Sequence, residues 1–290
     1  MSAGIAGRRI LITGAARGIG AATARRLHAR GARLVLAGIE PDLLARTASE
    51  CGDALAVVCD VRDREQVEAA VEAAVEQLYG LDVVIANAGV AAQLPLIGGD
   101  PTVFERTIEV NLIGAYYTLR AAGPHIAHPQ GYALAISSLA AALHPPLLGA
   151  YCASKAGVEA LADSLRTELA PSGARVGVAY FAELDTDMVR QGFGTAAAKR
   201  MSESRFAGRR VAPLDAGIDA IERGIARRAR HVVAPRWVAP LLPMRMLAQR
   251  AVEAATRGSI ESVLEIARDE DAPLTTPQPA VPRDRRAHSS

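Results

Sequence analysis

Short apolar runs alternate with helical segments along this chain, and that alternation constrains the fold more than any other feature. The apolar runs lie at residues 8–14, 32–38, 54–60, 81–89, 131–138 and 174–180, and helical patterns follow at 19–31, 41–50 and 64–80. The runs are nearly continuous in apolar residues, which is typical of strands buried on both faces of a parallel sheet. The sequence therefore predicts an α/β fold, a doubly wound parallel sheet in three layers.

The alternation predicts one domain over residues 1–256, with loops and C-terminal helices at about 185–256 that follow the last predicted strand. Residues 257–290 form a C-terminal extension. Its last part, 270–290, carries four prolines and many polar residues, so little of it can be buried. We expect a largely disordered tail after about residue 270.

Composition excludes several classes of partner. The net charge of +2 over 290 residues is too small to indicate a nucleic-acid partner. The cysteines, at 51, 59 and 152, form no CxxC pair and no disulfide framework, so we interpret them as reduced thiols and predict no metal site. The start of the chain does not resemble a signal peptide, and no apolar run approaches the roughly 20 residues that span a bilayer. We therefore expect a cytoplasmic protein.

A glycine-rich stretch, "TGAARGIG" at 13–20, joins the first predicted strand to the first helix. Glycines at 14, 18 and 20 would let the backbone turn tightly and approach a pyrophosphate. The helix N-terminus would add free N–H groups and the positive end of its dipole. This position in the first strand–helix unit favours a dinucleotide-binding loop over an ordinary glycine turn.

Together with this loop, four further features make the chain similar to a known family. They are "NAG" at 87–89, Asn111, Ser138 and "YCASK" at 151–155. In this order and spacing they resemble the short-chain dehydrogenases/reductases over roughly residues 5–235. The glycine spacing resembles the compact dehydrogenase branch of that family. The resemblance implies a Rossmann-like fold and an NAD(P)(H) cofactor.

The resemblance also implies which residues contact the cofactor. By position in the family's motifs these are Gly14, Arg17, Gly18, Ile19, Gly20, Gly38, Asp60, Val61, Asn87, Ala88, Gly89, Tyr151, Lys155 and Thr186. For Asp60 an equally good interpretation is a carboxylate that caps a turn.

The choice between NAD and NADP depends on the end of the second strand. In the family, an acidic side chain there accepts hydrogen bonds from the adenosine ribose and repels a 2′-phosphate. This sequence has Gly38 at that position, and Arg17 could pair with a 2′-phosphate. Glu40, two residues further on, could still reach the ribose. On balance the sequence favours NADP.

Tyr151 and Lys155 stand four positions apart, which on a helix places them on one face, one turn apart. Alone, tyrosine has a pKa near 10. A neighbouring ammonium, and the positive charge of an oxidised nicotinamide, should lower the pKa of Tyr151 toward the range useful for acid–base catalysis.

The resemblance implies the catalytic roles. Tyr151 would exchange a proton with the substrate oxygen, and Ser138 would donate a hydrogen bond to the same oxygen. Lys155 would bind the nicotinamide ribose, and Asn111 would hold a water in a proton relay to Lys155. Structural alternatives are a strand-end cap for Ser138 and a helix-kink role for Asn111. Between Tyr151 and Lys155, we expect Cys152 and Ser154 to serve in packing.

The chain departs from the family after its sixth predicted strand. Relatives usually have a Pro-Gly pair there, whereas this chain has Phe181 and Ala182. Loss of both residues must change the local backbone. Phe181 either narrows the nicotinamide pocket or fills the core.

Substrate contacts in the family come from loops that correspond here to about 90–100, 139–150 and 187–212. The first two are largely apolar, which favours a hydrophobic alcohol or carbonyl substrate. We interpret His144 as an ordinary loop histidine. Residues 235–250 combine Trp237 with leucines, methionines and arginines. This composition favours a subunit interface or a lid on the pocket over a membrane-surface helix.

The leading hypothesis is an NAD(P)(H)-dependent oxidoreductase that interconverts an apolar secondary alcohol and its ketone. A catalytically silent dinucleotide-binding regulator is an alternative, as is an NAD(P)-dependent epimerase or lyase that uses the same tyrosine and lysine. The retained Tyr151 and Lys155 disfavour the regulator, and the glycine spacing disfavours the epimerase. By analogy with relatives we expect a homo-dimer or homo-tetramer.

Overall fold

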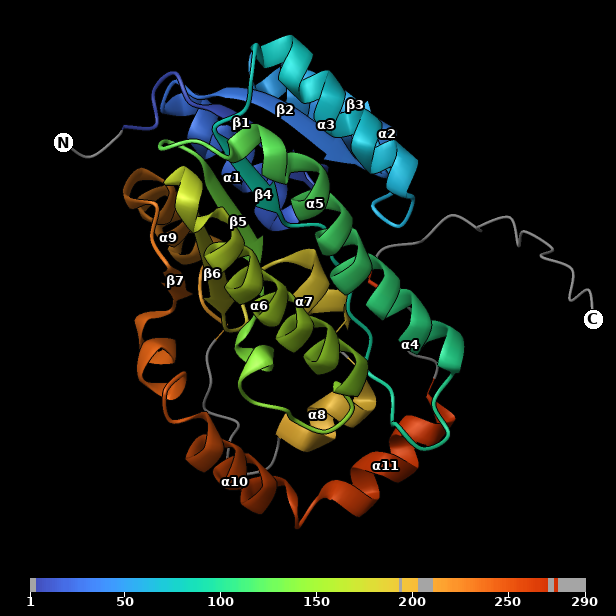
Figure 1. Ribbon diagram of the computed structural model, residues 1–290. Helices are drawn as coiled ribbons and strands as arrows, with labels where there is room; N and C mark the ends of the chain where they lie inside the picture. The colour runs from blue at the N-terminus through green and yellow to red at the C-terminus, as the bar shows by residue number, and fades with distance from the viewer. Residues whose placement is uncertain (1–3, 193–194, 203–210, 271–273, 276–290) are drawn as a thin grey trace, which may run out of the picture.

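A seven-stranded parallel sheet forms the centre of the computed structural model, which describes residues 4–192, 195–202, 211–270 and 274–275 (Figure 1). The strand order is β3-β2-β1-β4-β5-β6-β7. The strands are β1 (Arg9–Thr13), β2 (Arg33–Gly38), β3 (Leu55–Val58), β4 (Val83–Ala86), β5 (Tyr132–Ile136), β6 (Arg175–Phe181) and β7 (His231–Ala234). The order reverses between β1 and β4, the point at which doubly wound sheets open a crevice for ligands. The predicted fold class is confirmed.

Helices cover both faces of the sheet and give the predicted three layers. One face carries α1 (Gly18–Ala29), α2 (Pro41–Glu50) and α9 (Leu214–Arg227), and the other carries α3 (Arg64–Leu78), α5 (Gly114–Ile126) and α6 (Gly149–Leu169). A π-helical turn at Glu109–Ile113 joins α4 (Pro101–Ile108) to α5. The described part of the chain also includes α7 (Asp187–Gly192), α8 (Ala196–Ser202), α10 (Arg245–Thr256) and α11 (Ile260–Asp269).

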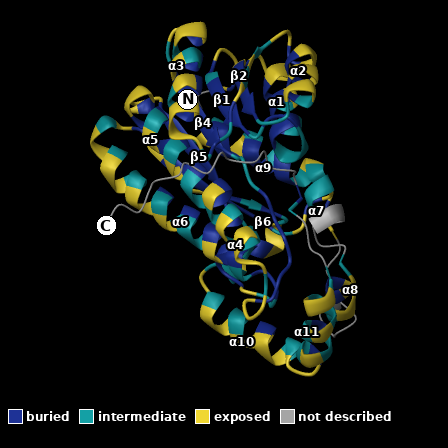
Figure 2. Ribbon diagram, turned by 90° about the vertical axis from the view of Figure 1, so that its right-hand side faces the viewer, coloured by how far each residue is buried: buried dark blue, intermediate teal, exposed yellow. Residues whose placement is uncertain are grey.

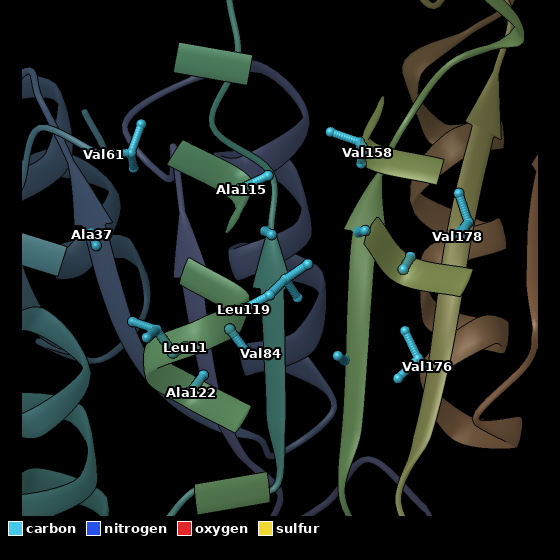
Figure 3. Close-up of a cluster of buried hydrophobic side chains, with 14 of the residues drawn as sticks. Leu11, Ala37, Val61, Val84, Ala115, Leu119, Ala122, Val158, Val176 and Val178 are labelled. Carbon is cyan, nitrogen blue, oxygen red and sulfur yellow. The ribbon is translucent and has the colours of Figure 1, made fainter. Parts of the chain in front are cut away.

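Alternate residues of each inner strand enter opposite halves of the core. In β1, Leu11 packs with the α5 and α6 side of the sheet, whereas Ile10 and Ile12 pack with α1 and α9. Figure 3 shows the first of these halves, where Leu119 of α5 and Val158 of α6 lie over the strands. Burial on both faces explains the continuous apolar runs. Strand β3 is the exception, because it lies at the sheet edge and alternates between partly buried and exposed residues.

Two local expectations were incomplete. Strand β7 was not predicted: it is four residues long, and it pairs with the end of β6 in register from Val178–His231 to Phe181–Ala234. Helix α3 ends at Leu78, two residues before the Gly80 that the sequence indicated. Tyr79 takes the left-handed conformation (φ 60°) at the helix end.

Helices α8, α10 and α11 lie at the end of the molecule away from β1–β3, at the bottom of Figures 1 and 2. A small cluster of Leu147, Ala197 and Val263, separate from the main core, joins α8 to α11. Glu270 accepts hydrogen bonds from the N–H groups of Ala196 (2.6 Å) and Ala197 (3.1 Å) at the start of α8. A domain boundary at residue 256 stays a prediction. The predicted disordered tail falls outside the described residues except for Leu274 and Thr275.

Among the described residues, no helix combines the length and apolar character that crossing a bilayer requires. Within the same ranges, no group of three or more His, Cys, Asp or Glu side chains could hold a metal ion. All three cysteines are buried free thiols.

Candidate active site

One cavity at the carboxyl ends of the strands brings together nearly all of the predicted site residues. It is lined by Gly14, Arg17, Gly18, Ile19, Gly38, Asp60, Val61, Asn87, Ala88, Gly89, Ser138, Tyr151, Lys155 and Thr186. Gly20 and Asn111 are not part of the lining. They contact it from behind, Gly20 at Gly14 and Asn111 beside Gly89.

The glycine loop is folded back against the end of β4. Asn87 donates from Nδ2 to the carbonyl oxygens of Thr13 (2.9 Å) and Gly14 (3.1 Å), and its own N–H donates to Oγ1 of Thr13. A Cβ added at Gly20 would lie 2.1 Å from the Gly14 carbonyl oxygen, so this position tolerates only glycine. Helix α1 begins at Gly18, next to the cavity. The result is a backbone cradle at a helix N-terminus, which fits a pyrophosphate.

Arg17 projects from this loop to the end of β2. Its Nε lies 3.1 Å from Oε2 of Glu40, and both side chains keep 27% of their surface exposed. Its Nη2 also donates to the carbonyl oxygen of Thr275 at 3.0 Å. Gly38, Ile39 and Glu40 line the cavity beside it. Arg17 and Glu40, which the sequence assigned to opposite cofactor preferences, are therefore ion-paired.

Asp60 and Val61 form the far wall of the same half of the cavity. The Asp60 carboxylate accepts hydrogen bonds from the N–H of Arg62 (3.0 Å) and from its Nε (2.9 Å). Val61 is 6% exposed, and its side chain packs against Gly114 of α5. Asp60 thus stabilises a turn while it lines the cavity, so both interpretations of this residue have a structural basis.

Asn111 and Lys155 meet behind Gly89. Asn111 lies in the π-helical turn, is 1% exposed, and exchanges two hydrogen bonds with the backbone of Val90 (2.7 and 2.9 Å). A Cβ added at Gly89 would lie 3.3 Å from Oδ1 of Asn111 and 3.5 Å from Nζ of Lys155. Glycine at 89 therefore leaves a narrow space that both polar groups border.

Tyr151, Lys155 and Ser138 face the cavity from α6 and the end of β5. Nζ of Lys155 lies 5.6 Å from the centre of the Tyr151 ring and donates to the carbonyl oxygen of Ile136 at 2.9 Å. Ser138 forms a hydrogen bond with Tyr151, accepts one from the N–H of Ala140 (3.1 Å) and donates to the carbonyl oxygen of Phe181 (3.3 Å). Ser138 therefore both caps the turn that follows β5 and contacts Tyr151.

Burial controls the protonation of this pair. It raises the pKa of Tyr151 to about 12, although the hydrogen bond with Ser138 acts in the opposite direction. Burial also lowers the pKa of Lys155 to about 8. The expectation that Lys155 lowers the pKa of Tyr151 is therefore wrong for the chain by itself, because loss of water around the phenol outweighs the neighbouring ammonium.

The segment after β6 replaces the expected Pro-Gly turn with a short pairing. Leu184 forms a bridge with Ala212, whose N–H donates to the carbonyl oxygen of Glu183 at 2.9 Å. Thr186 is 7% exposed, and its Oγ1 accepts a hydrogen bond from the N–H of Val189 in α7. Phe181 is 4% exposed and lines the cavity, so it both fills core and borders the site.

Beyond Tyr151 the cavity is mainly apolar. The lining side chains there are Val90, Leu139, Ala140, Leu143, Pro145, Leu148, Phe181, Leu184, Met188, Val189 and Trp237. Most come from the loops that the sequence indicated; Phe181 and Leu184 come from the end of β6 and the segment after it, and Trp237 comes from the segment after β7. Trp237 supports the lid interpretation for the start of 235–250. His144 is exposed and is not among the lining residues; its N–H donates to Oε1 of Gln249.

Sequence reasoning missed three residues. Ser154, expected to serve only in packing, accepts a hydrogen bond from Nδ2 of Asn111 at 3.0 Å and donates to the Tyr151 carbonyl oxygen. Glu183 also lines the cavity. It directly follows Phe181 and Ala182, which replace the family's Pro-Gly pair, and an acidic residue at that position could have indicated a place in the site. Thr275 lines the cavity from the C-terminal extension, where no motif could have indicated it.

The sheet order, the switch point and the cradle of the glycine loop define a Rossmann-fold protein. A model of the family described as "short chain dehydrogenase" matches residues 8–195. This chain therefore belongs to the short-chain dehydrogenase family. It is accordingly an oxidoreductase that acts on CH–OH groups with an NAD(P) cofactor.

Individual relatives agree with this assignment. The chain is 35% identical over 206 residues to (-)-trans-carveol dehydrogenase of Rhodococcus erythropolis, which covers 64% of this chain and 74% of that protein. It is also 35% identical over 204 residues to glycine betaine reductase ATRR of Emericella nidulans. That match covers 69% of this chain but spans only 16% of the relative's length. A dehydrogenase/reductase structure from Sinorhizobium meliloti 1021 has a TM-score of 0.72 and 28% identity, over 80% of this chain and 95% of that one.

Proposed function

We propose that this protein interconverts an apolar secondary alcohol and the corresponding ketone, with Tyr151 as the general acid and base. The observation that carries the proposal is the convergence of Tyr151, Ser138 and Lys155 on one cavity that has a glycine cradle at one end and apolar walls at the other. A bound nicotinamide supplies or accepts the hydride in such chemistry.

The remaining steps belong to side chains of this chain. With a pKa of about 12, the phenol of Tyr151 is protonated near neutral pH, so it can donate its proton to the oxygen of a ketone. Ser138, which is hydrogen-bonded to Tyr151, can turn its hydroxyl hydrogen from the Phe181 carbonyl oxygen to that same substrate oxygen and stabilise its developing charge. Lys155 and Asn111 border the space behind Gly89, which supports the predicted proton relay, through a water held by Asn111, to Lys155.

We propose NADP(H) as the preferred cofactor. Gly38 leaves no carboxylate at the end of β2, and Arg17 supplies a guanidinium on the cavity wall. Glu40 opposes this preference because it neutralises Arg17 at 3.1 Å. A 2′-phosphate carries more charge than a carboxylate and can replace Glu40 on Arg17. The preference therefore depends on an exchange of partners at a single side chain.

The substrate is proposed to be apolar because the walls beyond Tyr151 are built from aliphatic and aromatic side chains, among them Leu143, Met188 and Trp237. Such walls gain free energy by burying apolar surface and would reject a charged substrate. The carveol dehydrogenase relative acts, by its name, on an apolar cyclic alcohol, which agrees with this class.

The proposed setting is the cytoplasm, since all three cysteines are buried free thiols. A homo-dimer or homo-tetramer is proposed by analogy with relatives. Neither a nucleic acid nor a membrane is a proposed partner.

The test is a screen of apolar ketones and alcohols with NADPH, NADH and their oxidised forms, followed by absorbance of the reduced nicotinamide. We expect turnover on apolar secondary alcohols or ketones, and a loss of about 10³-fold or more in kcat for Tyr151→Phe with cofactor binding retained. Full activity of Tyr151→Phe would remove Tyr151 from the mechanism. Turnover confined to charged substrates would refute the apolar class.

A further inference from the structure

Thr275, from the C-terminal extension, lines the same cavity as the glycine loop. It is 5% exposed, and two hydrogen bonds hold it against the chain that follows "NAG". Its N–H donates to the carbonyl oxygen of Ala91 at 3.1 Å, and the N–H of Ala91 donates to Oγ1 of Thr275 at 3.1 Å. The threonine therefore satisfies both backbone groups of Ala91, which a side chain without a hydroxyl could not do.

The third polar group of Thr275 reaches across to the glycine loop. Its carbonyl oxygen accepts a hydrogen bond from Nη2 of Arg17 at 3.0 Å, while Nε of Arg17 lies 3.1 Å from the Glu40 carboxylate. Two acceptors from distant parts of the chain thus fix one guanidinium. A long arginine side chain loses rotamer freedom when a ligand fixes it, so holding Arg17 in advance lowers the cost of binding a ligand to it.

Two residues that precede Thr275 in the sequence hold the segment against the rest of the protein. Leu274 packs against the main core, and Glu270 binds the N–H groups at the start of α8. Thr275 itself forms part of the cavity wall. This geometry is that of a wall residue and differs from a plug that would have to leave before a ligand could enter.

We propose that Thr275 is a positioning residue of the cofactor site, which orients Arg17 for the adenosine end of the dinucleotide. The proposal rests on the proposed function in requiring that this protein bind NAD(P)(H). The hydrogen bonds to Ala91 hold Thr275 in place, and the Thr275 carbonyl then holds Arg17.

The experiment compares the full-length protein with Thr275→Val, Thr275→Ser and Thr256→Val. Valine removes the Oγ1 acceptor with little change in shape, whereas serine keeps it. Thr256 is the control, because its hydroxyl bonds within its own helix α10. The readouts are Kd for NADPH and NADH by fluorescence of the reduced nicotinamide, the cofactor KM and kcat, and Tm.

We expect Thr275→Val to raise Kd and KM for NADPH roughly 3- to 10-fold with little change in kcat. Thr275→Ser should restore the wild-type value, and Thr256→Val should not alter it. If Thr275 acts through Arg17, the effect of Thr275→Val should fall below about twofold in an Arg17→Ala background.

An unchanged Kd in Thr275→Val overturns the proposal, and so does an equal loss in the Arg17→Ala background. Tighter binding by Thr275→Val also overturns it, because that result describes a segment that competes with the cofactor. Each of these outcomes leaves the proposed function intact, since the wild type binds the dinucleotide. Wild-type protein that binds neither NADPH nor NADH refutes the proposed function and the role of Thr275 together.

Discussion

Lys155 approaches the ring of Tyr151 to 5.6 Å, yet its ammonium donates to the Ile136 carbonyl oxygen at 2.9 Å, at the end of β5. The lysine is therefore fixed to the sheet and not to the tyrosine. Burial lowers the pKa of Lys155 to about 8 and raises the pKa of Tyr151 to about 12. The usual order of the two pKa values is thus reversed: the pKa of Lys155 lies below that of Tyr151.

The first prediction concerns pH. Alcohol oxidation needs the phenolate of Tyr151, and below its pKa of about 12 the phenolate fraction rises about tenfold per pH unit. We expect kcat/KM for oxidation to rise steadily from pH 6 to 9, and kcat/KM for ketone reduction to stay level from pH 6 to 7.5. Initial rates in both directions across this range test the prediction. Tyr79→Phe, an exposed tyrosine on α3's end, is the control and should keep both profiles; a rate of oxidation that falls with pH contradicts the role.

The second prediction concerns the ion pair of Arg17 and Glu40. Glu40→Gln removes the carboxylate that competes with a 2′-phosphate, so NADPH should bind roughly 5- to 10-fold tighter and NADH little changed. Arg17→Ala should weaken NADPH more than NADH. Titration of both cofactors into each variant measures these effects. Binding of NADH at least tenfold tighter than NADPH by the wild type would show that the proposed preference is wrong.

The third prediction concerns the close approach in the glycine loop. Gly20→Ala would place a methyl carbon 2.1 Å from the Gly14 carbonyl oxygen, so the loop must move away from Asn87. We expect cofactor affinity to fall at least about tenfold and stability to fall by about 1–3 kcal/mol. Calorimetry of cofactor binding and urea unfolding measure the two effects. Gly258→Ala, where an added Cβ meets nothing within 4 Å, should change neither.

The fourth prediction concerns the ion pair that joins β1 to the start of β4. Burial of Asp82 opposes its ionisation, but hydrogen bonds from Arg9 (3.0 and 2.6 Å) prevail and hold the pKa of Asp82 below its usual value. A lowered pKa in the folded state means that the stabilisation is present above about pH 4 and is lost as pH falls.

Asp82→Asn should therefore reduce the free energy of unfolding by about 1–3 kcal/mol at pH 7, and the difference from wild type should shrink below pH 4. Urea unfolding at pH 7 and pH 3.5 compares the two. Glu72→Gln, at an exposed site on α3, is the matched control. An equal loss at both pH values would mean that packing and not charge explains the effect.

Much of the fold could be predicted because its inner strands are buried on both faces. A short, continuous apolar run such as that around Leu11 or Val84 is typical of such a strand. The proposed catalytic residues could be predicted for a different reason: Ser138 follows β5 directly, and Tyr151 and Lys155 lie on α6, the next long helix. Strand β7 was not predicted, because it has only four residues and follows arginines, so its apolar run is too short to indicate a strand.

What the sequence could not indicate depends on contacts between distant residues. Thr275 contacts Arg17 and Ala91 only in the folded protein, and the sequence around Thr275 is polar and predicts a tail. The raised pKa of Tyr151 could also not be predicted from the sequence. Spacing along α6 gives its distance from Lys155, whereas the dominant effect is burial by residues from other elements.

The small cluster of Leu147, Ala197 and Val263 lies apart from the main core, so we expect α8 and α11 to form a separate unit of local stability. Few apolar contacts hold α8 and α11 together, so this unit can open at a lower free energy than the sheet. In hydrogen exchange its amides should lose protection before those of β4 and β5. Substitutions in this cluster should then loosen α8 and α11 while the central sheet keeps its stability, so this is the part of the described chain that can change at least cost to folding.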